Sequence, residues 1–308
     1  MVASVSEPQI RRSRESGNPL VREEAALSSE VDSRFRGNDG IAERSPKEIS
    51  PHVAITPLGF GTRLTLRVGC VLLEDAGHRV LVDPGHFDSK AELLQALKQH
   101  AGLTLADIDT VFFTHLHFDH YNDLDFSEVG EVLISDEEMI FIDASAQAGE
   151  GGDESYRNFL NMHYEFVAPV FMRQFMRLYR DARYDFENVS FASTMRRVRA
   201  GENVTPNVRI VALPGHSPGL LGLVCDTRWG NTLIAGDAVL SREDMCSPEG
   251  EAHLIWHRKE QLLQTRDACM KFDAIVPGHG PWFCPATARV LGENNEIRNE
   301  TELEINHG

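Results

Sequence analysis

One short segment constrains this chain more than any other, the run Thr114-His115-Leu116-His117-Phe118-Asp119-His120. It directly follows the apolar run TVFFT at 110–114, which predicts a buried strand. Alternation along an extended chain points His115, His117 and Asp119 to the same side, and one turn brings His120 to them. Imidazole and carboxylate groups are the ligands that zinc and related metals prefer. The segment therefore predicts a metal site at the end of a strand.

Three further motifs share one plan, in which an apolar strand ends in glycine and a side chain able to bind metal follows. They are PGHSPG at 214–219, AGDA at 235–238 and VPGHG at 276–280. Glycine permits tight turns at strand ends, so the next side chain can point into a shared crevice. We therefore expect His216, Asp237 and His279 to join the cluster at 115–120.

Taken together, HxHxDH, PGHSPG, AGDA and PGHG resemble the metallo-β-lactamase superfamily, with the nearest likeness to its glyoxalase II and lactonase-like hydrolases. The alternation of strands and helices predicts layered α/β packing. The resemblance implies an α/β four-layer αββα sandwich with a helical insert. It also implies that His115, His117 and His216 hold a first metal, that Asp119, His120 and His279 hold a second, and that Asp237 bridges the two.

The resemblance extends to the activity. It implies two zinc ions, with iron or manganese as alternatives, and a metal-bridging hydroxide that hydrolyses a small ester, lactone or thioester. Asp119 and Asp237 are the expected catalytic carboxylates. The motif VDPG at 82–85 matches a strand end of the family, and Asp83 there would orient a ligand histidine or else only cap a turn. True β-lactamases of this fold lack the bridging aspartate, which disfavours antibiotic hydrolysis.

Two other functions remain open on the same site, a phosphodiesterase or nuclease and a sulfur-handling oxidoreductase. A net charge of −17 argues against a nucleic-acid partner, because phosphate backbones are bound by basic surfaces. A small-molecule substrate is therefore expected, with a homodimer left open. The chain has no apolar run of about 20 residues, which predicts no membrane span. Its five cysteines form no CxxC pair, which is typical of a reducing, cytoplasmic setting.

The chain divides by composition into two parts. Residues 1–50 have no sustained apolar period and are expected to be a disordered or non-native N-terminal extension. Residues 51–308 are expected to form the hydrolase domain, with a helical insert at about 144–195. Within that insert, the Met- and Phe-rich stretch at 154–184 predicts helices broken at Pro169, which form a wall over the site, a dimer interface or ordinary core.

Several local expectations can be compared with the structure. A hairpin is predicted around 75–77, and a helix at 89–100 with Ser89 as N-cap and Leu93, Leu94 and Leu97 on one buried face. Further helices are expected at 256–271 and 285–295. His253 and His257 are four residues apart, a spacing that can bind metal on a helix, but they are assigned a solvated position or one at the rim of the site. Tyr121, Tyr164 and Tyr184 are expected to pack, with substrate hydrogen bonding as the alternative.

Overall fold

The computed structural model of the protein describes residues 53–59, 69–86, 89–121, 124–181, 184–246 and 253–291. All of these belong to one compact unit, Ile49–Gly308. The expected extension at 1–50 lies outside the described residues. In the described ranges, every helix is too short or too polar to cross a lipid bilayer.

The first sheet has six strands in the order β1-β2-β3-β4-β5-β7. These strands are β1 Ala54–Pro57, β2 Val71–Asp75, β3 His78–Val82, β4 Thr110–Phe112, β5 Glu131–Ser135 and β7 Met195–Val198. Strands β2 and β3 form the predicted hairpin, with positive φ at Ala76 (51°) and Gly77 (87°) as a tight turn requires. From β3 to β7 the neighbouring strands are parallel, so their carboxyl ends meet at one edge of the sheet.

The second sheet has seven strands in the order β15-β14-β13-β11-β10-β9-β8. These strands are β8 Asn203–Thr205, β9 Val208–Ala212, β10 Leu221–Thr227, β11 Gly230–Gly236, β13 Ala274–Pro277, β14 Phe283–Cys284 and β15 Arg289–Val290. Strand β10 is antiparallel to both β9 and β11, and β11 is parallel to β13. The carboxyl ends of β9, β11 and β13 therefore also share one edge.

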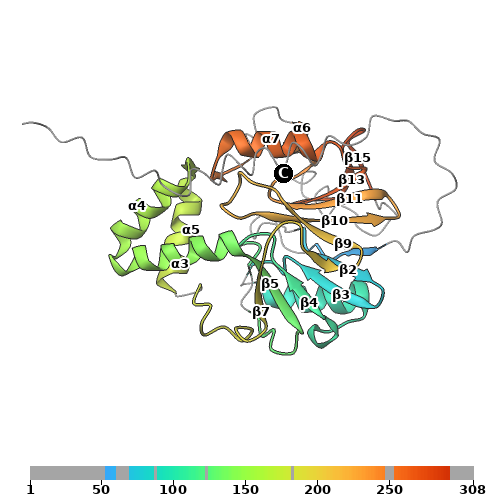
Figure 1. The fold of residues 1–308 in the computed structure, drawn as a ribbon, viewed down its shortest axis with the longest axis horizontal. Helices are drawn as coiled ribbons and strands as arrows, with labels where there is room; N and C mark the ends of the chain where they lie inside the picture. Colours follow the sequence, from blue (N-terminus) through green and yellow to red (C-terminus); the bar gives the residue numbers. More distant parts are fainter. Residues whose placement is uncertain are drawn as a thin grey trace, which may run out of the picture. The chain divides into compact units, whose positions relative to one another are not determined.

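Helices cover the outer faces of the two sheets and form a separate group beside them (Figure 1). Those that cover the sheets are α2 Lys90–Ala96 with its π-helical continuation η2 Leu97–Ala101, the 3₁₀ turn η3 Leu105–Asp107, α6 Arg242–Cys246 and α7 Lys259–Cys269. The group beside the sheets consists of α3 Asp136–Glu150, α4 Asp153–His163 and α5 Pro169–Arg180. A small ribbon pairs β6 Phe166–Val167 with β12 Ile255–Trp256.

Three apolar cores correspond to the three interfaces between four layers. Leu72 and Leu81 of the first sheet pack with Leu93 of α2, whereas the alternate residues Leu73 and Val80 point into the core between the sheets. Side chains of a strand alternate between its two faces, so a strand buried on both sides reads as a continuous apolar run. The second sheet behaves likewise: Ile234 enters the core between the sheets and Leu233 packs outward in the core that includes Cys269 of α7. The expected αββα sandwich is confirmed.

Several local predictions were wrong. The described part of the expected helix at 285–295 is a hairpin instead, because Phe283 pairs with both Ile275 and Val290 and extends the second sheet. The helix expected from 256 begins only at Lys259, since Trp256 lies in β12 and stacks on Phe166 with ring centroids 4.4 Å apart. Ser89 is the N-cap residue of α2, as predicted, but its side chain makes no capping hydrogen bond.

Proline 169 does separate two helices, as expected, because it stands at the first turn of α5, where its missing N–H has no partner to lose. On α2, Leu93 and Leu97 are fully buried as predicted, but Leu94 is 43% exposed. The helix therefore presents a narrower apolar face to the first sheet than its sequence indicated.

Leu93 and Leu94 form a matched pair for measuring the strength of this packing. We expect Leu93→Ala to lower the free energy of unfolding by about 2–5 kcal/mol, because it leaves a cavity in a closed core. Leu94→Ala should change it by no more than about 0.5 kcal/mol, as is usual for surface substitutions. Urea denaturation of both variants measures the difference, and equal losses would contradict the assignment of Leu93 to the core.

Candidate metal centre

All seven predicted site residues follow the carboxyl ends of strands. His115, His117, Asp119 and His120 come after β4, His216 after β9, Asp237 after β11 and His279 after β13. Backbone bonds from the N–H groups of His120 and Tyr121 to the carbonyl of His117 form the turn that returns His120 to the cluster. The N–H of Leu221, in the second sheet, donates to the carbonyl of Thr114 at 2.9 Å, so the two sheets are joined at this point.

Two glycines next to the predicted ligands are required because the backbone there passes very close to neighbouring atoms. At Gly215 φ is 126°, and a Cβ would lie 2.2 Å from the backbone nitrogen of Leu262. At Gly278 a Cβ would lie 1.9 Å from Oδ1 of Asp237. Only glycine fits at such positions, which explains why glycine precedes His216 and His279 in the sequence motifs.

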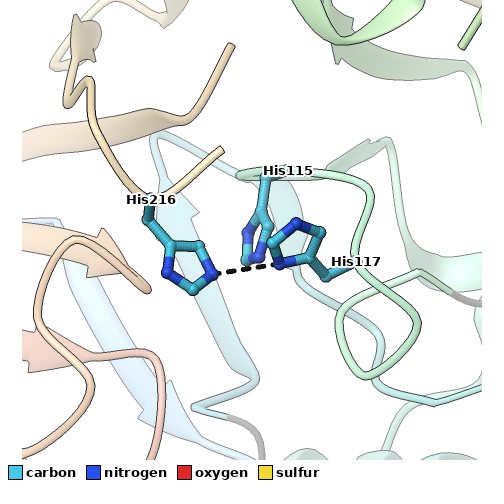
Figure 2. Close-up of side chains that lie close together, drawn as sticks. All are labelled: His115, His117 and His216. Carbon is cyan, nitrogen blue, oxygen red and sulfur yellow. Dashed lines mark hydrogen bonds between the residues drawn. The ribbon is translucent and has the colours of Figure 1, made fainter. Parts of the chain in front are cut away.

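The seven side chains form two groups. His115, His117 and His216 make up the first, and Asp119, His120, Asp237 and His279 the second; in each group the potential ligand atoms lie within 4.8 Å of one another. In Figure 2 the three imidazoles of the first group turn their ring nitrogens toward one another. Nε2 of His216 lies 3.0 Å from Nδ1 of His117.

The carboxylate of Asp237 lies between the two groups. Its Oδ2 is 3.3 Å from Nε2 of His216 and 3.9 Å from Nε2 of His115. Its Oδ1 is 3.0 Å from Nε2 of His120 and 3.3 Å from Nε2 of His279. Each oxygen thus faces one group, an arrangement that lets a single carboxylate contact two cations.

These distances fit divalent cations. Two nitrogens bound to zinc at about 2.0–2.1 Å in a tetrahedron lie roughly 3.3 Å apart, close to the spacings observed here. Within the described residues, the buried atoms Nε2 of His115 and Oδ1 of Asp119 have no hydrogen-bond partner. Buried polar atoms are normally paired, so unpaired ones that converge indicate a missing partner such as a metal ion.

The protonation of the histidines differs between the groups. Burial lowers the pKa of His115, His117 and His216, to about 3 for His117, so their imidazoles are neutral and can bind metal. Burial alone would also lower the pKa of His120 and His279, but the Asp237 carboxylate raises both. In the second group, a cation would therefore bind by displacing protons.

Asp83 orients two of the histidines. Its Oδ2 lies 2.8 Å from Nδ1 of His120 and accepts from the Thr114 hydroxyl at 2.7 Å, and its Oδ1 accepts from the Thr114 N–H at 2.8 Å. Because that hydroxyl donates to Asp83, its oxygen can accept from Nδ1 of His115, 3.0 Å away. Both imidazoles thereby present Nε2 to the site. This geometry supports the orienting role over the turn-capping alternative.

Tyr164 orients a third histidine from the helical group. Its hydroxyl lies 3.1 Å from Nε2 of His117, which leaves Nδ1 of that ring to face the site. The sequence suggested Tyr164 for packing or for substrate binding, and the structure places it instead against a metal-competent ring. Tyr184 donates to the carbonyl of Leu116 at 2.6 Å, and Tyr121 is buried among aromatic rings.

Sequence reasoning missed Glu138, a buried carboxylate on α3. Its Oε2 accepts from the Leu116 N–H at 3.2 Å, while its Oε1 accepts from the Ser217 hydroxyl at 2.5 Å and the Gly219 N–H at 2.8 Å. It therefore ties the loop that carries His115 and His117 to the loop that carries His216. An acidic residue in the first turn of a helix is common, because it interacts favourably with the helix dipole. The sequence therefore gave no signal that distinguished Glu138 from such residues.

The assignment of His253 to the rim of the site was wrong. Its side chain is 2% exposed and its Nδ1 lies 3.2 Å from Nδ1 of His216. The helical i, i+4 spacing with His257 was misleading, because the segment enters the short strand β12 instead of a helix.

Comparison with known proteins relates this chain to one family. The sequence profile of the metallo-β-lactamase superfamily matches residues 65–126, which include the segment 115–120. Metallo-β-lactamase domain-containing protein 1 of Xenopus laevis is 28% identical over 288 residues, which cover 90% of this chain and 99% of that protein. Both matches support the resemblance to the metallo-β-lactamase superfamily that the sequence motifs indicated.

Solved structures of this superfamily share the fold. A metallo-β-lactamase family protein of Thermus thermophilus is 24% identical, with a TM-score of 0.52 over 78% of this chain and 77% of that one. The hydrolase AbOPH is 19% identical, with a TM-score of 0.51 over 70% and 73% of the two chains. Metallo-β-lactamase superfamily members are mostly metal-dependent hydrolases, and the His/Asp cluster of this chain is compatible with such a site.

Gly278 provides a test of the cluster that leaves every candidate ligand in place. We expect Gly278→Ala to displace the Asp237 carboxylate and to lower the bound divalent metal well below that of the wild type, as measured by inductively coupled plasma mass spectrometry. Gly280→Ala is the control, because its φ of 96° adds strain but its Cβ would come no closer than 3.9 Å to a neighbouring atom. Equal metal contents in the two folded variants would contradict this geometry.

Proposed function

We propose that this protein is a dinuclear, zinc-dependent hydrolase of small esters, lactones or thioesters, in the glyoxalase II and lactonase-like branch of its superfamily. The observation that carries the proposal is the position of Asp237, whose two oxygens face two separate groups of histidines. A site built for a single cation would have no use for this shared carboxylate. We assign the hydrolase domain to residues 51–308, with the insert at about 144–195.

The ligand assignment follows the two groups. His115, His117 and His216 hold the first cation, Asp119, His120 and His279 the second, and Asp237 contacts both. This donor set of imidazoles and carboxylates suits zinc, and iron or manganese as alternatives. Cations bound there would supply a hydroxide near neutral pH and polarise the oxygen of a substrate carbonyl.

The protein's own groups position the reactants. Oδ1 of Asp119 has no hydrogen-bond partner among the described residues. It can accept a hydrogen bond from a nucleophilic water and so direct that water toward the substrate. Asp237 keeps the two groups of histidines at a fixed separation. Three imidazoles are held against rotation during turnover by partners on the side of the ring that faces away from the site. These partners are Asp83 for His120, Thr114 for His115 and Tyr164 for His117.

The helical group supports a substrate with an apolar part. Phe175 and Phe171 of α5 lie against His117, with ring centroids 5.6 Å and 6.4 Å away. Phe118 contacts Phe171 at 5.0 Å and His86 at 5.9 Å. These rings form an apolar wall beside the first group, suited to an acyl chain or an aromatic group. The His279 side chain is 21% exposed, against 4% or less for Asp237 and Asp119, so substrate approaches from the His279 side.

The cytoplasmic setting is also part of this proposal. All five cysteines are free. Burial raises the pKa of Cys70, Cys225 and Cys269, which makes these thiols unreactive. Cys246, by contrast, is exposed. An exposed free thiol persists most readily in a reducing compartment.

Asp237 gives the most direct test of the dinuclear site. Asp237→Ala should lower the occupancy of the second metal and reduce turnover by more than about 100-fold, because loss of even an outer partner of a metal ligand costs 10–100-fold. The fold should persist by circular dichroism. Asp226→Ala, at an exposed position of β10, is the control and should keep both the metal content and the rate. Full activity of Asp237→Ala would refute the shared carboxylate.

The substrate class is tested separately on the wild-type protein loaded with zinc. A panel of lactones, thioesters, simple esters, phosphodiesters and persulfides should give turnover on the carbonyl compounds, with higher kcat/KM for those that carry an apolar acyl chain. Hydrolysis confined to phosphodiesters would replace this proposal with a phosphodiesterase. Oxidation of persulfides alone would point to sulfur chemistry instead.

A further inference from the structure

A buried chain of polar groups leads from the metal-competent ring of His216 to the interior of the second half of the molecule. Nδ1 of His216 lies 3.2 Å from Nδ1 of His253, and Nε2 of His253 lies 3.1 Å from Oδ2 of Asp244. Oδ1 of Asp244 lies 3.5 Å from the Arg266 guanidinium, which also donates to the Asp244 carbonyl. His253, Asp244 and Arg266 are 2%, 1% and 4% exposed.

When both imidazoles are neutral, the chemistry of these groups fixes which atom donates and which accepts along the chain. A carboxylate only accepts, so Nε2 of His253 carries the proton that it donates to Asp244. Nδ1 of a neutral His253 then accepts, and the proton between the two rings belongs to Nδ1 of His216. Nε2 of His216 is left with its lone pair, and this atom lies 3.0 Å from Nδ1 of His117 and 3.3 Å from Oδ2 of Asp237.

We propose that His253 and Asp244 are positioning residues that hold His216 in the tautomer and orientation needed to bind the first metal. This inference rests on the proposed metal site and adds a carboxylate–histidine–histidine relay to it. The relay gives His216 a hydrogen-bond partner behind its ring. Asp83 is the corresponding partner of His120, Thr114 that of His115 and Tyr164 that of His117. Each of these four imidazoles then has a partner at the nitrogen that faces away from the site.

The carboxylate at the end of the relay also braces the rest of the site. Oδ2 of Asp244 accepts from the Leu240 N–H at 3.1 Å, and the Leu240 carbonyl accepts from the His279 N–H at 2.7 Å. Leu240 itself belongs to the turn that follows Asp237. Substituting Asp244 would therefore disturb several ligand loops at once, whereas substituting His253 removes the direct contact with His216 and leaves the bond between Asp244 and the Leu240 N–H in place.

Three variants separate orientation from packing. His253→Phe keeps a ring in the cavity but cannot accept the proton of His216. His253→Asn can place its side-chain oxygen near the position of Nδ1 and so restore the acceptor. His257→Phe is the matched control, since His257 bonds to the His216 carbonyl through its backbone N–H, which phenylalanine retains, and its ring packing on Tyr164, with centroids 5.9 Å apart, is also kept.

The measurement is the release of zinc to a competing chelator, combined with long-range proton–nitrogen NMR spectra of histidine-labelled protein. We expect His253→Phe to weaken one of the two zinc sites by about 10–100-fold and to remove the Nδ1–H signature of His216. His253→Asn should recover most of the affinity, and His257→Phe should match the wild type.

The outcomes distinguish this inference from the proposed function. A wild-type protein that binds no divalent metal would overturn the metal site and, with it, the relay. A wild type that binds two metals while His253→Phe binds both as tightly would overturn the relay alone. Weakening in His253→Phe that His253→Asn does not relieve would assign His253 a packing role and equally overturn the inference.

Discussion

The structure around this site depends on one buried carboxylate shared between two sets of imidazoles. Asp237 is 3% exposed, and an ionised group at that depth is costly unless positive charge or hydrogen bonds surround it. The imidazoles of His120 and His279 hold its pKa well below the usual range, although burial raises it. Cations would provide the same compensation more completely, because each oxygen already faces its own group of ligands.

The double sheet makes this convergence stable. The carboxyl end of β4 in one sheet meets the ends of β9, β11 and β13 in the other, and the bond from the Leu221 N–H to the Thr114 carbonyl joins them. Glu138 adds a second connection, between the loop at 116 and the loop at 217–219. Short loops on two packed sheets leave the ligands little freedom, which is the preorganisation that favours metal binding and electrostatic catalysis.

In the proposed enzyme, the helical group would contact both the metal ligands and the substrate. Through Tyr164 it orients His117, and through Phe171 and Phe175 it forms an apolar wall beside the same ring. An apolar wall excludes water and so strengthens the electrostatic interactions next to it. One element thus combines the tuning of a metal ligand with the shaping of the substrate pocket, a combination that can couple substrate binding to the state of the first metal.

The motifs in the sequence were sufficient to predict the superfamily, the αββα sandwich and the residues of the two groups, because ligand chemistry depends on residue type and on position after a strand. The apolar runs that precede these motifs likewise predicted the strands β4, β9, β11 and β13. The final hairpin at β14 and β15 was missed, because pairing of Phe283 with Ile275 is a long-range contact that local propensity does not encode.

Two of the groups behind the ligands, Glu138 and His253, were decided by the tertiary structure alone. Glu138 lies 79 positions from Ser217, and His253 lies 37 positions from His216, and no local pattern links either pair. The sequence by itself determined which atoms can bind metal. Only the packing of two sheets and their helices decided which nitrogen of each ring faces the site, because a tautomer is set by the partner on the other side of the ring.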